Sequence, residues 1–192
     1  MPELSDLRLR LRDIVADKGL THFDEPVQLA SGEWSQDFID AKRALADGAD
    51  LEVACRAMIA AADEAGATWD AVGGLTMGAD HFAHGVALLA GRHWFVVRKQ
   101  PKGRGTNKLV EGWPLGPGDS VFLVDDVVTT GGSIQKAYHQ VVDTGATVTF
   151  AATIVDRGEV ARRFFADVAV PYTPLLTYTD LGIPPIGGGT PT

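Results

Sequence analysis

The chain has 192 residues, of which 45% are hydrophobic and 22% are charged, which is enough for one globular domain with a substantial core. Its 17 Lys and Arg residues are outnumbered by 25 Asp and Glu residues, and the net charge of -8 argues against a general binder of nucleic acids or anionic lipids. The single cysteine, Cys55, excludes an intramolecular disulfide and a zinc site built from cysteines, and it favours a reducing compartment.

Residues 1–48 are predicted to form an N-terminal helix and a small hood, which we define as residues 27–46. Apolar residues recur at helical spacing over residues 4–15, and Gly19 is predicted to end this helix in the left-handed conformation. The hood contains short extended pieces on either side of a turn at Gly32, which favours a hairpin.

No targeting or membrane segment is expected. Arg8, Arg10 and Arg12 alternate with leucines near the N-terminus, where a signal peptide would need a continuous apolar stretch. No apolar run approaches the roughly 18 residues of a membrane span. We therefore expect a soluble, cytoplasmic protein with no membrane or nucleic-acid partner.

Residues 49–183 are predicted to form the main body of the same domain. Its first helix begins at Asp47 or Asp50 and ends at Gly66. Because almost unbroken apolar strands then alternate with helices, the pattern indicates an α/β fold with a mostly parallel, twisted sheet flanked by helices. The tail, residues 184–192, is rich in Pro and Gly and is expected to be flexible. The predicted strands are 71–75, 93–97, 121–124, 148–155 and 172–176, and the helices are 82–89, 133–144 and 159–165.

The most informative loop follows the predicted strand 121–124. It is expected to carry two acids at the strand tip and then a hydroxyl-rich glycine turn that opens a helix. Backbone N–H groups at a helix N-terminus can hold a phosphate, and paired carboxylates can accept hydrogen bonds from vicinal sugar hydroxyls. The pattern therefore predicts a ribose 5-phosphate site, with an ordinary strand, turn and helix cap as the alternative. The residues are Asp125, Asp126, Thr129, Thr130, Gly131, Gly132 and Ser133.

This segment resembles the motif of type I phosphoribosyltransferases, which is an apolar strand, two acids, two variable residues and a Thr/Gly turn. The resemblance implies that these residues bind 5-phosphoribosyl 1-pyrophosphate (PRPP). It also implies that Thr76, Met77 and Gly78, which follow the strand 71–75, bind the pyrophosphate part through backbone amides. Taken alone, a glycine turn before a helix is more often a point of close packing.

A basic segment, Arg98-Lys99-Gln-Pro-Lys102-Gly-Arg104-Gly105, resembles the mobile catalytic loop of orotate phosphoribosyltransferases, which runs Arg-Lys-x-x-Lys-x-His-Gly. The resemblance implies a homodimer in which loop 98–112 closes over the neighbouring subunit's active site. Lys102, with Lys99 and Arg98, would then neutralise the departing pyrophosphate. Arg104 replaces the family's histidine and cannot exchange a proton near neutrality, which argues against an acid or base role there. A solvated basic loop is the alternative.

Two further segments concern the base. Arg157 resembles the arginine with which the family holds orotate, and a guanidinium suits a planar anionic pyrimidine; a surface arginine at a helix start is the alternative. Residues 29–40 resemble the family's Ser-Gly-x-x-Ser-Pro-Tyr-Phe stretch, in which aromatic rings lie over the base. Here Gln36 and Asp37 replace Pro and Tyr, and Phe38 remains. An aspartate there is unfavourable beside an anionic substrate unless it is turned away or paired. The resemblance implies that Arg157, Phe38 and Thr129 bind orotate.

The resemblance as a whole implies an orotate phosphoribosyltransferase of pyrimidine biosynthesis, which transfers 5-phosphoribosyl from PRPP to orotate and releases pyrophosphate. It implies Mg²⁺ as the cofactor, held mainly by PRPP, with assistance through water from Asp125 and Asp126 and no direct protein ligand. Two alternatives stay open. The departures at positions 36, 37 and 104 suggest a phosphoribosyltransferase for another base, and a non-catalytic PRPP-binding regulator would use the same clamp without chemistry.

The remaining polar and aromatic candidates are expected to be structural. His81 and His84 share a helical face, but no further ligand completes a zinc set, so they are expected to be hydrogen-bonded helix residues. Cys55 is expected to be an inert, buried small side chain. Core or interface packing is expected for Trp69, Trp94 and Trp113.

Overall fold

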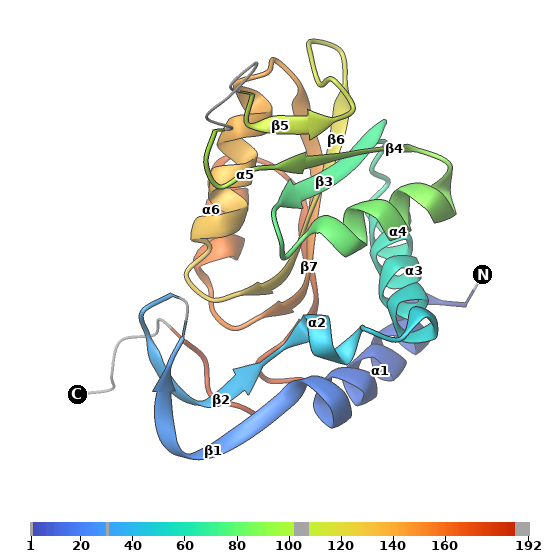
Figure 1. Cartoon of the computed structure of the whole chain (residues 1–192). Helices are drawn as coiled ribbons and strands as arrows, with labels where there is room; N and C mark the ends of the chain where they lie inside the picture. Colours follow the sequence, from blue (N-terminus) through green and yellow to red (C-terminus); the bar gives the residue numbers. More distant parts are fainter. Residues whose placement is uncertain (1, 30, 102–107, 187–192) are drawn as a thin grey trace.

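The computed structural model describes residues 2–29, 31–101 and 108–186, which contain two sheets (Figure 1). The larger sheet has the strand order β5-β4-β3-β6-β7-β8, and β1 pairs with β2 in a separate antiparallel hairpin. The strands are β1 (Leu20–Gln28), β2 (Trp34–Ile39), β3 (Ala71–Leu75), β4 (His93–Val97), β5 (Val110–Gly112), β6 (Ser120–Val128), β7 (Thr147–Asp156) and β8 (Tyr172–Thr177). The helices are α1 (Leu4–Ile14), the π-helical turn η1 (Val15–Gly19), α2 (Ala41–Ala44), α3 (Gly48–Glu64), α4 (Asp80–Ala90), α5 (Gly132–Val142) and α6 (Val160–Asp167).

The large sheet is mostly parallel. Strand β3 pairs in parallel with β4 and β6, and β7 pairs in parallel with β6 and β8. At one edge, β5 runs antiparallel to β4. The predicted α/β fold with a mostly parallel sheet is therefore confirmed.

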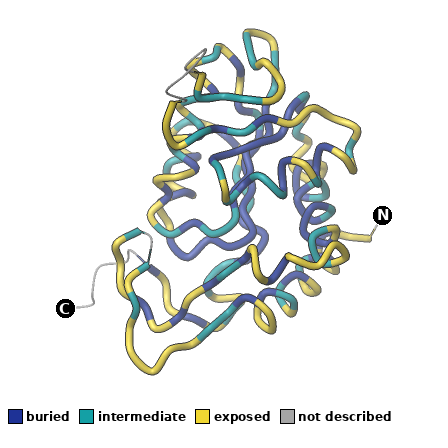
Figure 2. Tube along the Cα trace, in the orientation of Figure 1, coloured by how far each residue is buried: buried dark blue, intermediate teal, exposed yellow. Residues whose placement is uncertain are grey.

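Both faces of the sheet are covered, as apolar strands require. Alternate residues of β6 point to opposite faces: Phe122 and Val124 pack with α1, α3 and α4, whereas Val121 and Leu123 pack with α5 and α6. Figure 1 shows these two helical layers on either side of the sheet, and Figure 2 shows the buried strands between them. No helix among the described residues is long and apolar enough to cross a membrane.

The N-terminal part differs from the prediction in two ways. The hairpin is present, but its first strand begins at Leu20, and the short helix α2 that follows it was not predicted. Gly19 does not adopt the predicted left-handed conformation. A Cβ at Gly19 would lie 2.8 Å from the Cβ of Ala44 and 3.0 Å from the carbonyl oxygen of Asp40. The glycine is therefore required by close packing against α2 and not by a helix cap.

Elsewhere the strand and helix order matches the prediction. The cap of α3 is Asp47, whose side chain accepts a hydrogen bond from the N–H of Ala49 at 2.8 Å. Strand β5 lies inside the segment predicted as a basic loop, and β6 continues past residue 124 to Val128. The predicted tail begins too early, because Ile186 is buried and its N–H donates to the carbonyl oxygen of Arg157 at 2.7 Å. The rest of that tail, residues 187–192, lies outside the described residues.

Candidate active site

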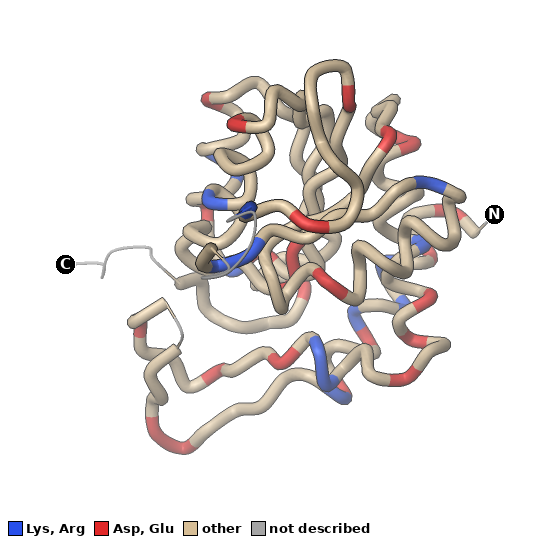
Figure 3. Tube along the Cα trace, turned by 45° about the horizontal axis from the view of Figure 1, so that its top comes forward, with Lys and Arg blue, Asp and Glu red and all other residues tan. Residues whose placement is uncertain are grey.

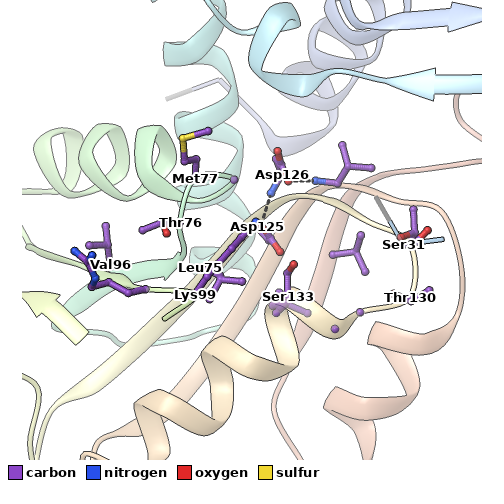
Figure 4. Close-up of a pocket in the computed structure, with 18 of the residues that line it drawn as sticks. Ser31, Leu75, Thr76, Met77, Val96, Lys99, Asp125, Asp126, Thr130 and Ser133 are labelled. Atoms are coloured by element: carbon purple, nitrogen blue, oxygen red, sulfur yellow. Dashed lines mark hydrogen bonds between the residues drawn. The ribbon is translucent and has the colours of Figure 1, made fainter. Parts of the chain in front are cut away.

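A cavity of about 1080 Å³ lies at the carboxyl ends of β3, β4 and β6, beside the N-terminus of α5 (Figure 4). In open α/β sheets this edge is where ligands bind, and the volume suits a small-molecule ligand. Its walls come from the hood, the turn after β3, the end of β4, strand β5 and the segment from β6 into α5. Among the lining residues are Ser31, Lys42, Thr76, Met77, Gly78, Arg98, Lys99, Asp125, Asp126, Thr129, Thr130, Gly131, Gly132 and Ser133.

The two acids lie within β6, not in a loop beyond its tip as predicted. Pairing of β6 with β3 ends at Leu123, whereas pairing with β7 continues to Val128. Backbone pairing on one side is enough to keep the chain extended, whatever the polarity of its side chains. Asp125 and Asp126 therefore project from an ordered strand at the point where β3 has already turned away (Figure 4).

The two carboxylates have different surroundings. Asp125 is 4% exposed, and its Oδ1 accepts a hydrogen bond from the N–H of Asp126 at 3.0 Å. Burial, together with the nearby charge of Asp126, raises the pKa of Asp125 to about 8. Asp126 accepts from the N–H of Val127 at 2.7 Å through Oδ1 and from Lys42 Nζ at 2.8 Å through Oδ2. The strand thus presents a buried acid that keeps its proton at neutral pH beside a carboxylate paired with a cation.

Gly78 brings the turn after β3 against both acids. A Cβ at this position would lie 2.7 Å from Oδ1 of Asp125 and 2.8 Å from Oδ1 of Asp126, so no larger residue fits without displacing them. Thr76 and Met77, which are joined by a cis peptide bond, line the same wall (Figure 4). The structure therefore brings the three predicted pyrophosphate-binding residues beside the acids, while binding itself stays a prediction.

The segment 129–133 leads into the N-terminus of α5. Gly131 is the N-cap, with a φ of 76°, a value that glycine adopts without strain. Within the described residues no side chain caps this helix, and a Cβ at Gly132 would meet no heavy atom within 4 Å. The first N–H groups of a helix have no intrahelical partner and carry partial positive charge. This end of α5 can therefore accept a phosphate from the cavity.

Two of the predicted cations reach the cavity. Arg98 and Lys99 line its wall where the chain leaves β4, and Nη1 of Arg98 donates to Oε1 of Glu111 at 3.1 Å. Lys102 and Arg104 lie outside the described residues. Figure 3 shows Lys and Arg positions interspersed with Asp and Glu positions along the chain. Because the net charge is -8, attraction of an anionic ligand has to arise locally, from groups such as these two cations.

Arg157 links the core to the hood, and its role in binding orotate stays a prediction. It is 1% exposed, so it is not a surface arginine, and it is not among the residues that line the cavity. Its Nη1 donates to the carbonyl oxygen of Asp37 at 2.7 Å, and its Nη2 donates to Oγ of Ser35 at 3.2 Å and to the carbonyl oxygen of Pro184 at 3.4 Å. The guanidinium therefore ties the end of β7 to the hood and to the C-terminal segment.

The hood strand β2 buries two of its polar side chains. Ser35 and Asp37 are buried, and the carboxylate of Asp37 lies 2.8 Å from Nδ1 of His22, so this unexpected aspartate is paired. Phe38 alternates with them, faces the other way and is 39% exposed. Phe38 and Arg157 are not among the residues that line the cavity, whereas Thr129, the third predicted orotate-binding residue, lines it. Binding of orotate by these three residues stays a prediction.

Sequence reasoning missed two hood residues that line the cavity. Lys42 forms the ion pair with Asp126, and Oγ of Ser31 is buried with no hydrogen-bond partner among the described residues. Ser31 lies in the segment that resembles the family's Ser-Gly stretch, but no role was assigned to it. No local pattern marks Lys42, because Lys42 and Asp126 are 84 positions apart. Figure 4 shows Ser31 on the side of the cavity near Thr130.

The remaining candidates, which are the cysteine, the histidines and the tryptophans, are not among the residues that line the cavity. Burial raises the pKa of the Cys55 thiol to about 12, which fits an inert side chain. The described residues contain no cluster of three His, Cys, Asp or Glu side chains suited to a metal ion. His81 departs from the prediction because its Nε2 is buried with no hydrogen-bond partner in the described part of the chain. Trp69 is buried, while Trp94 and Trp113 are partly exposed.

Comparison with known proteins agrees with this geometry. Residues 43–165 match the phosphoribosyl transferase domain family. The orotate phosphoribosyltransferase of Methanothermobacter thermautotrophicus is 36% identical over 175 residues, which cover 91% of this chain and 94% of that protein. The crystal structure of Mycobacterium tuberculosis H37Rv orotate phosphoribosyltransferase in complex with Fe(III) dicitrate has a TM-score of 0.79 and 34% identity, covering 92% of this chain and 99% of that one. The structure of the same enzyme with PRPP has a TM-score of 0.70 and 30% identity, covering 95% and 100% of the two chains. The chain therefore belongs to the orotate phosphoribosyltransferase family.

Proposed function

We propose that this protein transfers the 5-phosphoribosyl group of PRPP to orotate, giving orotidine 5′-phosphate and pyrophosphate, as a step of pyrimidine biosynthesis. The observation that carries the proposal is the cavity itself. It unites a carboxylate pair, an uncapped helix N-terminus and two cations from separate segments, and these groups match the sugar hydroxyls, the 5-phosphate and the pyrophosphate of PRPP.

Different residues of the cavity bind different parts of PRPP. The N-terminal N–H groups of α5 and the hydroxyls of segment 129–133 bind the 5-phosphate. Asp126, and Asp125 beside it, bind the ribose hydroxyls. The backbone of Thr76 to Gly78 approaches the pyrophosphate.

In the reaction the bond between ribose C1 and the pyrophosphate oxygen breaks, and a nitrogen of orotate forms the new bond to C1 from the opposite face. Negative charge accumulates on the leaving pyrophosphate and positive charge on the ribose ring. Arg98 and Lys99, with Lys102 and Arg104 from the same basic segment, would stabilise the leaving group where its charge develops. Exclusion of water from the cavity would protect the ribosyl cation from hydrolysis.

The acids are also suited to a divalent cation. Asp125 and Asp126 offer hard oxygen atoms that face one cavity, and Mg²⁺ is usually bound by one or two carboxylates together with substrate phosphates. When bound, Mg²⁺ would neutralise part of the pyrophosphate charge. We propose that it is held mainly by PRPP, with the two acids assisting through water.

A homodimer is also part of the proposal. Leu88, Trp94 and Trp113 are partly or largely exposed on α4, β4 and the chain after β5, and exposed apolar side chains of this size are common at subunit interfaces. We propose that loop 98–112 is shared between the two subunits. The cytoplasmic location expected from the single cysteine stays a prediction.

The test of the activity is a pyrophosphate-release assay with PRPP and Mg²⁺, in which orotate is compared with uracil, guanine, hypoxanthine and adenine. Of these five bases, we expect only orotate to support the release of pyrophosphate. Release with another base would identify a different phosphoribosyltransferase. Binding of PRPP without release for any base would identify a regulator and exclude the enzyme.

The role of the basic segment has its own test. Lys102→Ala should lower kcat by about a hundredfold or more, because a charge-stabilising contact to the leaving group is lost. Binding of PRPP should stay largely intact in a calorimetric titration. An unchanged kcat would remove Lys102 from the mechanism.

A further inference from the structure

Lys42 places a positive charge from the hood beside the acids of the core. It lies in α2, whose cap Asp40 accepts a hydrogen bond from the N–H of Arg43 at 3.1 Å. Ala41 and Ala44 of the same helix are buried, which fixes how α2 sits on the molecule. The Nζ of Lys42 reaches Oδ2 of Asp126 at 2.8 Å, at the wall of the cavity.

The contact with Lys42 fixes the orientation of the Asp126 carboxylate. Oδ1 is held by the N–H of Val127, and Oδ2 is held by Lys42, so neither oxygen can rotate freely. Each carboxylate oxygen can accept more than one hydrogen bond, so both remain able to accept a ribose hydroxyl. The Asp126 side chain is 14% exposed and is among the residues that line the cavity.

The contact also balances charge. Without Lys42, the carboxylate of Asp126 would carry an unpaired negative charge at the wall of the cavity, next to the buried Asp125. Burial lowers the pKa of Lys42, but the hydrogen bond and charge of Asp126, with Asp40 and Asp125, outweigh burial and raise it. Lys42 therefore remains a charged ammonium group beside Asp126.

We propose that Lys42 is a positioning residue of the sugar site. It acts through Asp126 by holding that carboxylate in the orientation that accepts the ribose hydroxyls. PRPP binding therefore depends on how the hood packs against the core. This inference rests on the proposed function for the identity of the ligand. It differs from a direct role, in which Lys42 would itself contact the pyrophosphate.

The decisive experiment is a double-mutant cycle on the Kd for PRPP with Mg²⁺, measured by calorimetry on the full chain. Lys42→Met keeps the length of the side chain and removes the charge, and we expect it to weaken PRPP binding about tenfold. Lys42→Arg should recover most of that loss. In an Asp126→Asn background, Lys42→Met should have less than about a twofold further effect, because coupled residues do not add.

Arg43→Met is the matched control. It removes the same charge from the same helix, but Arg43 does not line the cavity, so we expect less than about a twofold change in Kd. A thermal melt of each variant separates loss of binding from loss of folding. Equal effects of Lys42→Met and Arg43→Met, or a tenfold effect of Lys42→Met that persists in Asp126→Asn, would overturn the proposal.

The outcomes separate this proposal from the proposed function. If wild-type protein binds PRPP but turns over no base, the enzyme assignment fails and the Lys42 cycle can still be read. If orotate is turned over and Lys42→Met binds PRPP normally, only the role of Lys42 fails. Absence of PRPP binding by the wild type would overturn both.

Discussion

The floor of the cavity and the hood beside it are built in different ways. The floor is one continuous segment, from β6 into α5, whose apolar residues are buried between two helical layers. The hood belongs to a two-stranded sheet whose first strand is mostly exposed (Figure 2). Its polar links to the core include the contacts from Lys42 to Asp126 and from Arg157 to Asp37, which span 84 and 120 residues. Contacts between residues far apart in the chain therefore place the hood, whereas the residues of the floor are contiguous in the sequence.

The largest effect is expected where the turn after β3 packs against the floor. Gly78→Ala would put a Cβ 2.7 Å from Oδ1 of Asp125 and would displace the carboxylate pair. We expect kcat/KM for PRPP to fall about a hundredfold, since displacements of about 1 Å have effects of this size. Gly116→Ala is the control, because a Cβ there meets no heavy atom within 4 Å. Similar kinetics for the two variants would mean that the floor tolerates displacement.

The next effect concerns the link between hood and core. Arg157→Met leaves the carbonyl oxygen of Asp37 and Oγ of Ser35 without their buried donor, and we expect the free energy of unfolding to fall by about 2 kcal/mol. Arg163→Met, on the exposed side of α6, should change it by less than about 0.5 kcal/mol. Denaturant unfolding gives both values. Equal stability of the two variants would show that the hood is held by other contacts.

Asp125 makes stability depend on pH. Its pKa is about 8 when folded, above that of an ordinary carboxyl, so the folded state retains a proton that the unfolded state has lost. Stability of the ligand-free protein should therefore fall as pH rises from about 4 to about 8. Asp125→Asn removes this loss, and we expect its Tm to exceed that of the wild type by about 5 °C at pH 8 and by less at pH 5. Parallel Tm curves for the two proteins would contradict the assignment.

The smallest effects are expected for substitutions on the two faces of the hood strand β2. Ser35→Ala removes an acceptor that holds the guanidinium of Arg157, the group predicted to bind orotate, and should raise KM for orotate about threefold. Phe38→Ala changes a side chain on the opposite face and should change KM by less than about twofold. Steady-state kinetics at saturating PRPP would measure both. A larger effect of Phe38→Ala would place its ring over the base, as the family resemblance implies, and would reverse the roles of the two faces.

Much of the fold follows from local pattern. The strands at residues 71–75 and 93–97 have the predicted bounds, because short apolar runs flanked by turn residues admit few other structures. The acids of β6 were placed in a loop because polar residues usually mark the end of a buried strand. Pairing with β7 keeps them in the strand, and a partner strand cannot be seen in the sequence of β6 alone.

The same division applies to the candidate site. The contiguous residues from Asp125 to Ser133 could be recognised because their chemistry and spacing lie within one short segment. The contact of Lys42 with Asp126, and the burial of Arg157 against the hood, depend on how segments far apart in the chain pack together. By itself the amino-acid sequence determined most of the order of strands and helices and the glycine-rich turn before α5, since these arise from periodicity and local hydrogen bonding. Only the tertiary structure decided which side chains meet across the cavity, because long-range packing sets those distances and the charges that each group experiences.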